Sequence, residues 1–178
     1  TEKFDAARID HKTIQNVNDI AQIPLTNKEE LLNAQEENPP FGSNATFPES
    51  AYSRFHQTSG TTGKPLRVLD TPESWEWWGR CWGFVLTGAG LTENDRLFVP
   101  FSFGPFIGFW AALEGARLIN AMMIPGGGRD SLERLHLMNE LGVTAICCTP
   151  TYALRLAEVA REAEFDLNEI PLRISILS

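Results

Sequence analysis

Residues 58–65 combine the backbone freedom and the side chains that are needed to hold a chain of phosphate groups. The glycines in this segment lack a Cβ atom, so the backbone there can bend and approach a ligand closely. Its hydroxyl groups can donate hydrogen bonds to phosphate oxygens, and its lysine adds a positive charge. We therefore predict a phosphate-binding site formed by Thr58, Ser59, Gly60, Thr61, Thr62, Gly63 and Lys64.

The spacing of this loop differs from that of the P-loop of kinases and GTPases. The P-loop pattern requires a glycine five residues before the glycine of its Gly-Lys pair, and Ser or Thr directly after the lysine. Thr58 and Pro65 occupy these two positions. The sequence therefore argues against a P-loop nucleotidase. The alternative without a ligand is a polar turn between two strands of a hairpin.

The composition is that of a globular protein with an acidic balance. The 178 residues include 15 Lys and Arg against 23 Asp and Glu, a formal net charge of −8. Non-specific nucleic-acid binding needs a basic face, so we predict no nucleic-acid partner. No apolar run approaches the roughly 20 residues of a membrane-spanning helix, so we predict no membrane contact. The three cysteines suggest no disulfide framework, which favours a cytoplasmic location.

Alternating strand and helix patterns would position the phosphate loop. Strands at 52–57 and 66–69 flank it, and Thr71 and Pro72 are typical of a helix start. The order predicts an α/β fold with a mostly parallel sheet and helices on both faces. The further elements are strands at 96–99, 121–124, 143–148 and 172–176, and helices at 109–118, from 130 and from 149.

We predict two parts of the chain: a helical or irregular lead-in at 1–50 and an α/β subdomain at 51–178. In the lead-in, Thr26 with Glu29 is typical of a capping box at a helix start. In the subdomain, Trp75, Trp78 and Trp82 share one helical face, which we expect to line the core.

Two adjacent cysteines and one histidine could have either a structural or a functional role. Cys147 and Cys148 lie in an apolar run, so we interpret them as buried strand residues. His56 lies just before the phosphate loop and could approach phosphate. We interpret it instead as a strand histidine whose hydrogen bonds are satisfied.

Three loops lie where ligands usually bind on such sheets. Open parallel sheets bind ligands outside the carboxyl ends of their strands. The loops at 58–65, 101–106 and 149–152 occupy such positions. Phe101, Phe103 and Phe106 could form a flat apolar slot for an aromatic ring, or they could simply fill the core.

The order of residues 58–65, Thr-Ser-Gly-Thr-Thr-Gly-Lys-Pro, resembles the phosphate-binding motif of the adenylate-forming (AMP-binding) superfamily of acyl-CoA synthetases, luciferases and peptide-synthetase adenylation domains. Within that superfamily, the chain is similar to the phenylacetate–CoA ligase group over roughly residues 20–178. The segments that resemble this group are Ile23-Pro24-Leu25-Thr26-Asn27-Lys28-Glu29-Glu30-Leu31, Phe103-Gly104-Pro105-Phe106 with Gly108, Ile124-Pro125 with the glycines after it, and Thr149-Pro150-Thr151-Tyr152-Ala153-Leu154.

The resemblance implies a ligase that uses ATP, Mg²⁺ and coenzyme A to convert a carboxylic acid into an acyl-adenylate and then an acyl-CoA. It also implies that the catalytic lysine and the Mg²⁺-binding glutamate lie beyond residue 178. We therefore expect an N-terminal fragment that is inactive alone, with no catalytic and no metal-binding residue of its own. The acyl pocket implied here comprises Phe101, Phe103, Gly104, Phe106, Thr149, Pro150 and Tyr152.

The chain departs from the group at two pocket positions. Phe103 replaces a tyrosine and Pro105 replaces a leucine, which favours an aryl or apolar acid that differs from phenylacetate. Two alternatives stay open. One is an adenylyltransferase of the same group that does not use coenzyme A. The other is a non-catalytic truncated module for dimerisation or ligand binding, with a second copy of the chain as a candidate partner.

Overall fold

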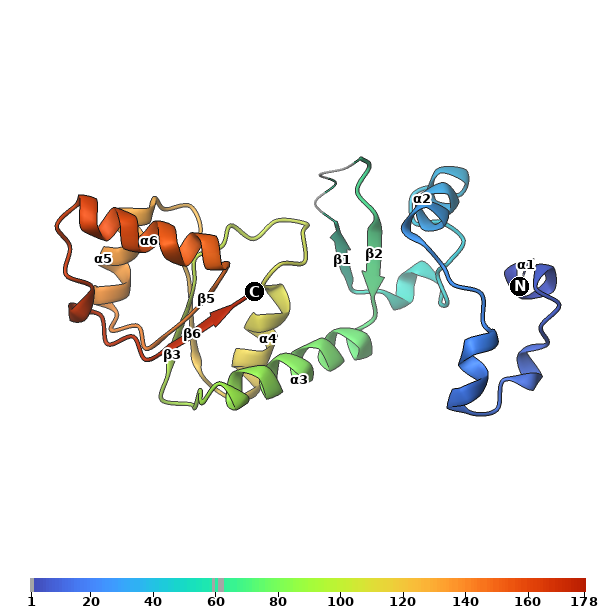
Figure 1. Cartoon of the computed structure of the whole chain (residues 1–178), viewed down its shortest axis with the longest axis horizontal. Helices are drawn as coiled ribbons and strands as arrows, with labels where there is room; N and C mark the ends of the chain where they lie inside the picture. The colour runs from blue at the N-terminus through green and yellow to red at the C-terminus, as the bar shows by residue number, and fades with distance from the viewer. Residues whose placement is uncertain (1, 59, 61–62) are drawn as a thin grey trace. The chain divides into compact units, whose positions relative to one another are not determined.

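The computed structural model describes residues 2–58, 60 and 63–178, with the side chains of Glu2 and His11 excepted (Figure 1). Contacts within the chain divide it into two compact units. The first comprises Thr1–Thr46 and Gly60–Leu66, and the second comprises Phe47–Ser59 and Arg67–Ser178. Among the described residues, none of the helices combines the length and the apolar character required to cross a membrane.

The first unit is mostly helical, and its longest helix starts one residue later than the sequence predicted. Asn27 caps this helix, because its side chain accepts from the Glu30 backbone N–H at 2.9 Å and Glu30 accepts from the Asn27 N–H at 3.2 Å. The Thr26 hydroxyl instead accepts from Lys3 at 3.1 Å. The predicted pair of Thr26 with Glu29 was therefore wrong. The elements are α1 (Glu2–Ala6), η1 (His11–Thr13), η2 (Val17–Gln22) and α2 (Lys28–Glu37).

The second unit confirms the predicted α/β architecture. A parallel sheet has the strand order β4-β3-β5-β6, and a separate antiparallel hairpin pairs β1 with β2. The strands are β1 (Arg54–Gln57), β2 (Arg67–Asp70), β3 (Arg96–Val99), β4 (Met122–Pro125), β5 (Ala145–Cys148) and β6 (Ile174–Leu177). The helices are η3 (Glu49–Ala51), α3 (Pro72–Gly88), α4 (Trp110–Leu118), α5 (Ser131–Glu140), α6 (Pro150–Glu162) and η4 (Leu167–Glu169).

Helices cover both faces of the parallel sheet (Figure 1). On one face, α5 and α6 pack on Phe98, Ile146 and Cys148. On the other face, α3 and α4 pack on alternate residues of the same strands, including Cys147. The predicted burial of both cysteines is confirmed. Burial and the neighbouring Cys148 raise the pKa of the Cys147 thiol to about 12, so it stays protonated at neutral pH.

The start of α3 was predicted, but its buried face was only partly so. Thr71 caps it, with its hydroxyl 3.1 Å from the Ser74 backbone nitrogen. Trp75 is buried, whereas Trp78 is 43% exposed. The reason is that Trp75, Gly79, Gly83 and Leu86 form the buried face of α3, and with 3.6 residues per turn Trp78 lies at the edge of that face. The helix packs closely on α4 there, because a Cβ atom at Gly79 would lie 2.6 Å from the Glu114 side chain.

A buried ionic network closes the amino-terminal edge of the parallel sheet. Asp95 is 3% exposed and accepts from the Thr144 hydroxyl at 2.6 Å, the Thr92 N–H at 2.8 Å and the Arg173 guanidinium at 2.5 Å. Burial alone would raise the pKa of the Asp95 carboxyl. The hydrogen bonds from Thr144, Thr92 and Arg173 outweigh burial and lower the pKa from 3.8 to about 2. The network therefore ties the starts of β3, β5 and β6 together.

We predict that Asp95→Asn lowers the free energy of unfolding at pH 7 by about 1.5–3 kcal/mol, since charge-assisted hydrogen bonds are lost. The folded-state pKa is depressed, so this stabilisation is complete above the ordinary pKa of 3.8 and disappears as the pH falls through about 2. Urea unfolding should show a smaller difference in unfolding free energy between wild type and variant at low pH than at pH 7. Glu93→Gln, an exposed change two residues away, should have little effect at either pH. A pH-independent difference for Asp95→Asn would contradict the assignment.

Candidate functional site

The described part of the predicted phosphate loop has the backbone geometry of a tight turn. The Gly63 N–H donates to the Gly60 carbonyl at 3.0 Å. Gly60 has φ +67°, and a Cβ atom there would lie 2.9 Å from the Gly63 carbonyl oxygen. Position 60 therefore requires glycine. The predicted phosphate ligands Ser59, Thr61 and Thr62 lie outside the described residues.

Lys64 has a carboxylate partner that the sequence did not reveal. Its ammonium nitrogen lies 2.5 Å from Glu36 on α2, and both side chains are largely exposed. Exposed ion pairs of this kind contribute only about 0–1 kcal/mol. A multiply charged phosphate would therefore compete effectively with Glu36 for the lysine.

The predicted apolar slot after β3 is a cluster of aromatic rings. Phe101 meets Phe103 and Phe109 edge-on, with ring centroids 5.3 and 5.5 Å apart. Phe101 and Phe103 also pack on the core of the second unit, whereas Phe106 is 43% exposed. The Trp110 indole N–H donates to the Gly104 carbonyl at 2.8 Å. The structure thus brings Phe101, Phe103, Gly104 and Phe106 together, with the first two rings partly occupied in core packing.

The predicted residues after β5 form the start of α6. The Thr149 hydroxyl caps the helix by accepting from the Tyr152 N–H at 3.3 Å, and Pro150 is its first residue. The Tyr152 hydroxyl lies 3.0 Å from the Ser131 hydroxyl and 2.5 Å from the Arg134 guanidinium. Tyr152 is therefore held by α5 rather than pointing freely into solvent.

Arg134 is a residue that the sequence analysis missed. Its guanidinium carbon lies 5.2 Å above the Tyr152 ring, and its Nε donates to the Gly126 carbonyl at 2.7 Å. It thus joins the turn after β4 to the helix after β5. No local pattern in the sequence marked this arginine.

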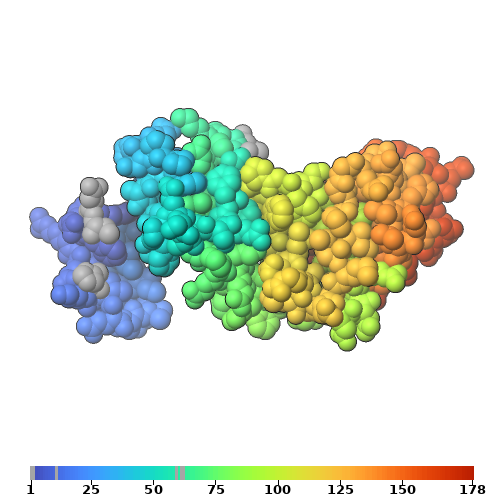
Figure 2. All heavy atoms as spheres, turned by 180° about the vertical axis from the view of Figure 1, so that it is seen from behind, coloured from blue at the N-terminus to red at the C-terminus, as the bar shows by residue number. Residues whose placement is uncertain are grey.

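Three loops meet at the carboxyl edge of the sheet. The Gly126 N–H donates to the Val99 carbonyl at 2.8 Å, and a Cβ atom at Gly127 would lie 2.9 Å from the Phe101 carbonyl oxygen. Figure 2 shows the yellow segment after β3 next to the orange segment after β4. Through Arg134, the same edge includes Tyr152. The candidate acyl-binding residues therefore occupy one region of the second unit.

His56 is buried, but the prediction that its hydrogen bonds are satisfied was wrong. Both ring nitrogens lack a partner of standard geometry, and so do Oδ2 of Asp70 and Nε1 of Trp75 beside it. Burial lowers the pKa of the imidazole, and the Arg54 charge lowers it further. The Asp70 carboxylate and the Pro105 carbonyl oppose this change. His56 is therefore neutral at physiological pH.

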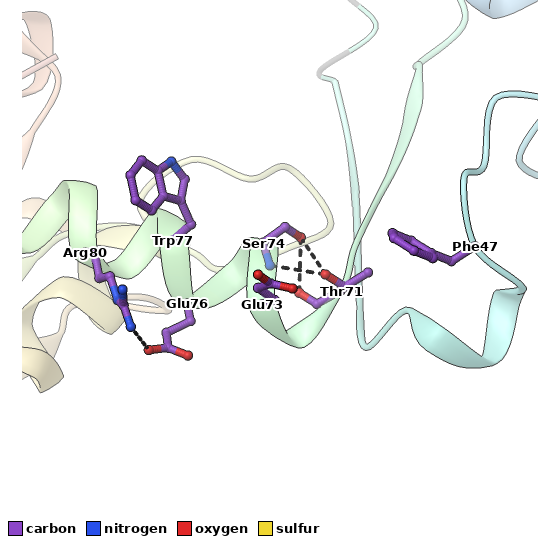
Figure 3. Close-up of a pocket in the computed structure, with 7 residues that line it drawn as sticks. All are labelled: Phe47, Thr71, Glu73, Ser74, Glu76, Trp77 and Arg80. Carbon is purple, nitrogen blue, oxygen red and sulfur yellow. Dashed lines mark hydrogen bonds and ion pairs between the residues drawn. The ribbon is translucent and has the colours of Figure 1, made fainter.

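A separate cavity of about 600 Å³ lies along α3 (Figure 3). Two of its charged groups pair with each other: Arg80 lies 2.7 Å from Glu76. Ser74 bonds to both Thr71 and Asp70. None of the predicted phosphate or acyl residues lines it, so we do not assign the site there. Its lining residues are Phe47, Thr71, Glu73, Ser74, Glu76, Trp77 and Arg80.

Comparison with known proteins gives a consistent family. The chain is 31% identical over 175 residues to the phenylacetate–coenzyme A ligase of Escherichia coli K12. This match covers 98% of the chain and 39% of that ligase. It is 30% identical over 158 residues to the phenylacetate–coenzyme A ligase of Pseudomonas putida, and this match covers 89% of the chain and 35% of that ligase. The chain belongs to the phenylacetate–CoA ligase group of the adenylate-forming superfamily. It spans less than two fifths of the length of these two relatives. No protein-family model matches it.

Solved structures of acyl-CoA ligases share the fold of this chain. A 2-hydroxyisobutyryl-CoA ligase in complex with 2-HIB-AMP and CoA matches with a TM-score of 0.91 and 29% identity. The match covers 99% of this chain and 38% of that one. The Bacillus subtilis O-succinylbenzoate coenzyme A synthetase, in complex with AMP, matches 72% of this chain at a TM-score of 0.53 and 24% identity, and so shows a shared fold. The predicted fold class is confirmed by these ligases.

We predict that Gly108→Ala destabilises the loop that contains Phe101, Phe103 and Phe106, which we call the phenylalanine loop. Gly108 has φ +36°, and its added Cβ would lie 2.6 Å from Cζ of Phe101. Overpacking of this kind costs about 1–3 kcal/mol, measurable by thermal or urea unfolding. Gly88→Ala is the matched control, because a Cβ atom at Gly88 would meet nothing within 4 Å. Equal effects of the two changes would contradict the packing of Phe101 on Gly108.

We also predict that Arg134 and Tyr152 are energetically coupled. Arg134→Met, Tyr152→Phe and the double variant should give unfolding free energies that are non-additive by about 0.5–3 kcal/mol, as for residues in direct contact. The exposed Arg117 on α4 provides the control: Arg117→Met combined with Tyr152→Phe should be additive within error. Additivity for Arg134 with Tyr152 would show that their contact contributes nothing.

Proposed function

We propose that the chain is the phosphate-holding part, and part of the acyl-binding surface, of an ATP-dependent acid:CoA ligase. Its substrate is an aromatic or another apolar carboxylic acid. The observation that supports this most strongly is the glycine turn of the phosphate loop, in a chain whose curated relatives are phenylacetate–coenzyme A ligases. The candidate acyl side chains cluster at the carboxyl edge of the second unit, where α/β sheets bind ligands.

The proposed reaction has two steps. A carboxylate oxygen of the acid attacks the α-phosphorus of ATP, the bond to the bridging oxygen breaks, and pyrophosphate leaves. The thiol sulfur of coenzyme A then attacks the acyl carbonyl carbon, loses its proton, and releases AMP. The role of residues 58–64 is to hold the β- and γ-phosphates and orient the leaving pyrophosphate. Positioning and charge stabilisation supply most of the catalysis in such transfers.

Lys64 contributes a positive charge to the binding of the phosphates and is not the catalytic lysine. Its ammonium group is exposed and paired only with Glu36 among the described ion pairs. Release of that weak pair leaves the lysine free to meet a phosphate oxygen.

Mg²⁺ enters this proposal only as the usual companion of ATP. The described residues contain no group of three His, Cys, Asp or Glu side chains that could hold a metal ion. We place the reaction in the cytoplasm, which agrees with three free cysteines.

The side chains of the phenylalanine loop should determine which acid binds. Phe103 packs edge-on against Trp110, with centroids 4.8 Å apart, and offers no hydroxyl to a substrate. Phe106 is the most accessible of the predicted rings. An apolar ring or chain without a polar substituent at that point is the best chemical match.

The test uses the full-length ligase with ATP, coenzyme A and a panel of aryl and aliphatic acids, scored for pyrophosphate, AMP and thioester. We expect pyrophosphate and thioester together with at least one apolar acid. Pyrophosphate without consumption of coenzyme A would identify an adenylyltransferase instead. No pyrophosphate with any acid would contradict the enzymatic proposal and favour a non-catalytic module.

We predict that Gly60→Val raises the KM for ATP of the full-length enzyme about tenfold or more, because the side chain strains the turn and blocks backbone approach. Lys64→Ala should raise the KM for ATP less, because this change removes only one positive charge. Lys28→Ala, which removes an exposed lysine at the start of α2, is the matched control and should leave the KM unchanged. Unaltered ATP kinetics in both loop variants would rule out the phosphate-binding role.

A further inference from the structure

The turn after β4 lies directly against the backbone of the phenylalanine loop. The Gly126 N–H donates to the Val99 carbonyl at 2.8 Å, so the turn continues the pairing of β4 with β3. A Cβ atom at Gly127 would lie 2.9 Å from the Phe101 carbonyl oxygen and 3.3 Å from Cα of Ser102. The two backbones are so close that a displacement of the turn would displace the first residues of the phenylalanine loop.

Arg134 of α5 holds this turn from outside the sheet. Its Nε donates to the Gly126 carbonyl at 2.7 Å, so the N–H and the carbonyl of Gly126 both have a partner. Gly126 is buried and leaves no room for a side chain, because an added Cβ atom would lie 2.4 Å from Cζ of Phe98. The position of the turn is therefore set by the sheet on one side and by Arg134 on the other.

The guanidinium of Arg134 is itself held by Tyr152 of α6. It donates to the Tyr152 hydroxyl at 2.5 Å, and its carbon lies 5.2 Å from the centre of the ring. Ser131 lies three residues before Arg134 on the same helical face, and its hydroxyl is 3.0 Å from that of Tyr152. The Tyr152 ring packs on the core between the sheet and helices α5 and α6. A planar guanidinium can bridge two acceptors and stack on a ring, whereas the ammonium group of lysine cannot.

We propose that Arg134 and Tyr152 are positioning residues for the acid, which fix the turn at Gly126 and Gly127 against the phenylalanine loop. The Tyr152 ring is anchored in the core, Arg134 connects it to Gly126, and the close approach at Gly127 extends the connection to Phe101. Every contact in this series lies within the second unit. Loss of either side chain leaves the phenylalanine loop less well supported, so the acid binds less tightly and acids of different size are distinguished less well. This inference rests on the proposed ligase function.

The kinetic test uses the full-length ligase and three variants of this pair. Arg134→Met removes the guanidinium, and Arg134→Lys keeps the positive charge without the planar bridge. Tyr152→Phe removes only the hydroxyl. Arg155→Met is the matched control, because Arg155 is an exposed arginine of α6 that pairs with Glu158 of the same helix at 3.3 Å.

We expect Arg134→Met to raise the KM for the acid about five- to twentyfold, less than the roughly hundredfold that a misplacement of about 1 Å can cost. The KM for ATP, whose phosphates are assigned to residues 58–64, should stay near that of wild type. The ratio of kcat/KM between two apolar acids that differ by one methylene should fall about threefold. Arg134→Lys should recover little, Tyr152→Phe should show a smaller change in the same direction, and Arg155→Met should behave as wild type.

Three results would overturn the proposal. The first is a wild-type KM and wild-type selectivity for the acid in Arg134→Met. The second is an equal rise in the KM values for acid and ATP, which would indicate a general loss of structure instead of a role in acid binding. The third is full recovery in Arg134→Lys, because the charge alone would then suffice.

A second measurement does not depend on activity. The Trp110 indole N–H donates to the Gly104 carbonyl at 2.8 Å, so its signal reports on the phenylalanine loop. In the full-length protein labelled with ¹⁵N-tryptophan, this signal, assigned through Trp110→Phe, should shift in Arg134→Met and not in Arg155→Met. Tyr152→Phe, the mildest change, decides the question if Arg134→Met does not fold.

This spectrum separates the two proposals. If no acid gives pyrophosphate but the Trp110 signal shifts, the proposed function is wrong while the connection from Arg134 to the phenylalanine loop stands. An unchanged Trp110 signal in Arg134→Met and in Tyr152→Phe contradicts the connection, whatever the ligase assay gives.

Discussion

Parallel pairing of β3 with both β4 and β5 is the constraint on which the candidate site depends. Leu97 pairs with Met123 on one side and with Ala145 on the other. Parallel strands end at the same edge of a sheet, so the loops after all three strands must meet there. The register is fixed because Phe98 and Leu97 enter opposite cores. A slip of one residue would exchange these faces and would separate the loops that form the site.

The two edges of this sheet have different roles. At the amino-terminal edge, Asp95, Thr144 and Arg173 form a saturated network in which every bond serves stability. At the carboxyl edge, the contacts are made by loop residues: aromatic rings meet edge-on, and Arg134 reaches from α5 to the Gly126 carbonyl.

The sequence predicted those features that depend on residues close together along the chain. The predicted helix start at Thr71 is confirmed, because Thr71 accepts from the backbone N–H three residues later; Asp130 and Thr149 cap the predicted helices from 130 and from 149 in the same way. The strands and the fold class followed from hydrophobic patterns, with boundaries that moved by up to two residues. The phosphate loop was identifiable from its composition, and its glycine requirement at position 60 agrees with the turn that the structure describes.

The features that the sequence missed depend on contacts through space. Nothing local to Arg134 indicates that it reaches both Gly126 and Tyr152. The burial of Gly79 and Gly83, in place of Trp78, follows from how closely α3 approaches α4. The unpaired state of His56 depends on where Trp75 and Pro105 lie. Such contacts are set by tertiary packing, which one sequence does not encode in any short segment.

The claim that residues 58–64 hold the phosphates of ATP is tested most directly by NMR of the full-length protein with ¹⁵N-labelled glycine. Titration with ATP, with pyrophosphate and with AMP would follow the backbone amides of Gly60 and Gly63. The phosphate-holding role predicts that ATP and pyrophosphate shift both signals and that AMP, which lacks the β- and γ-phosphates, leaves them nearly unchanged. Equal shifts with AMP and ATP, or no shift at either glycine at saturating ATP, would contradict it.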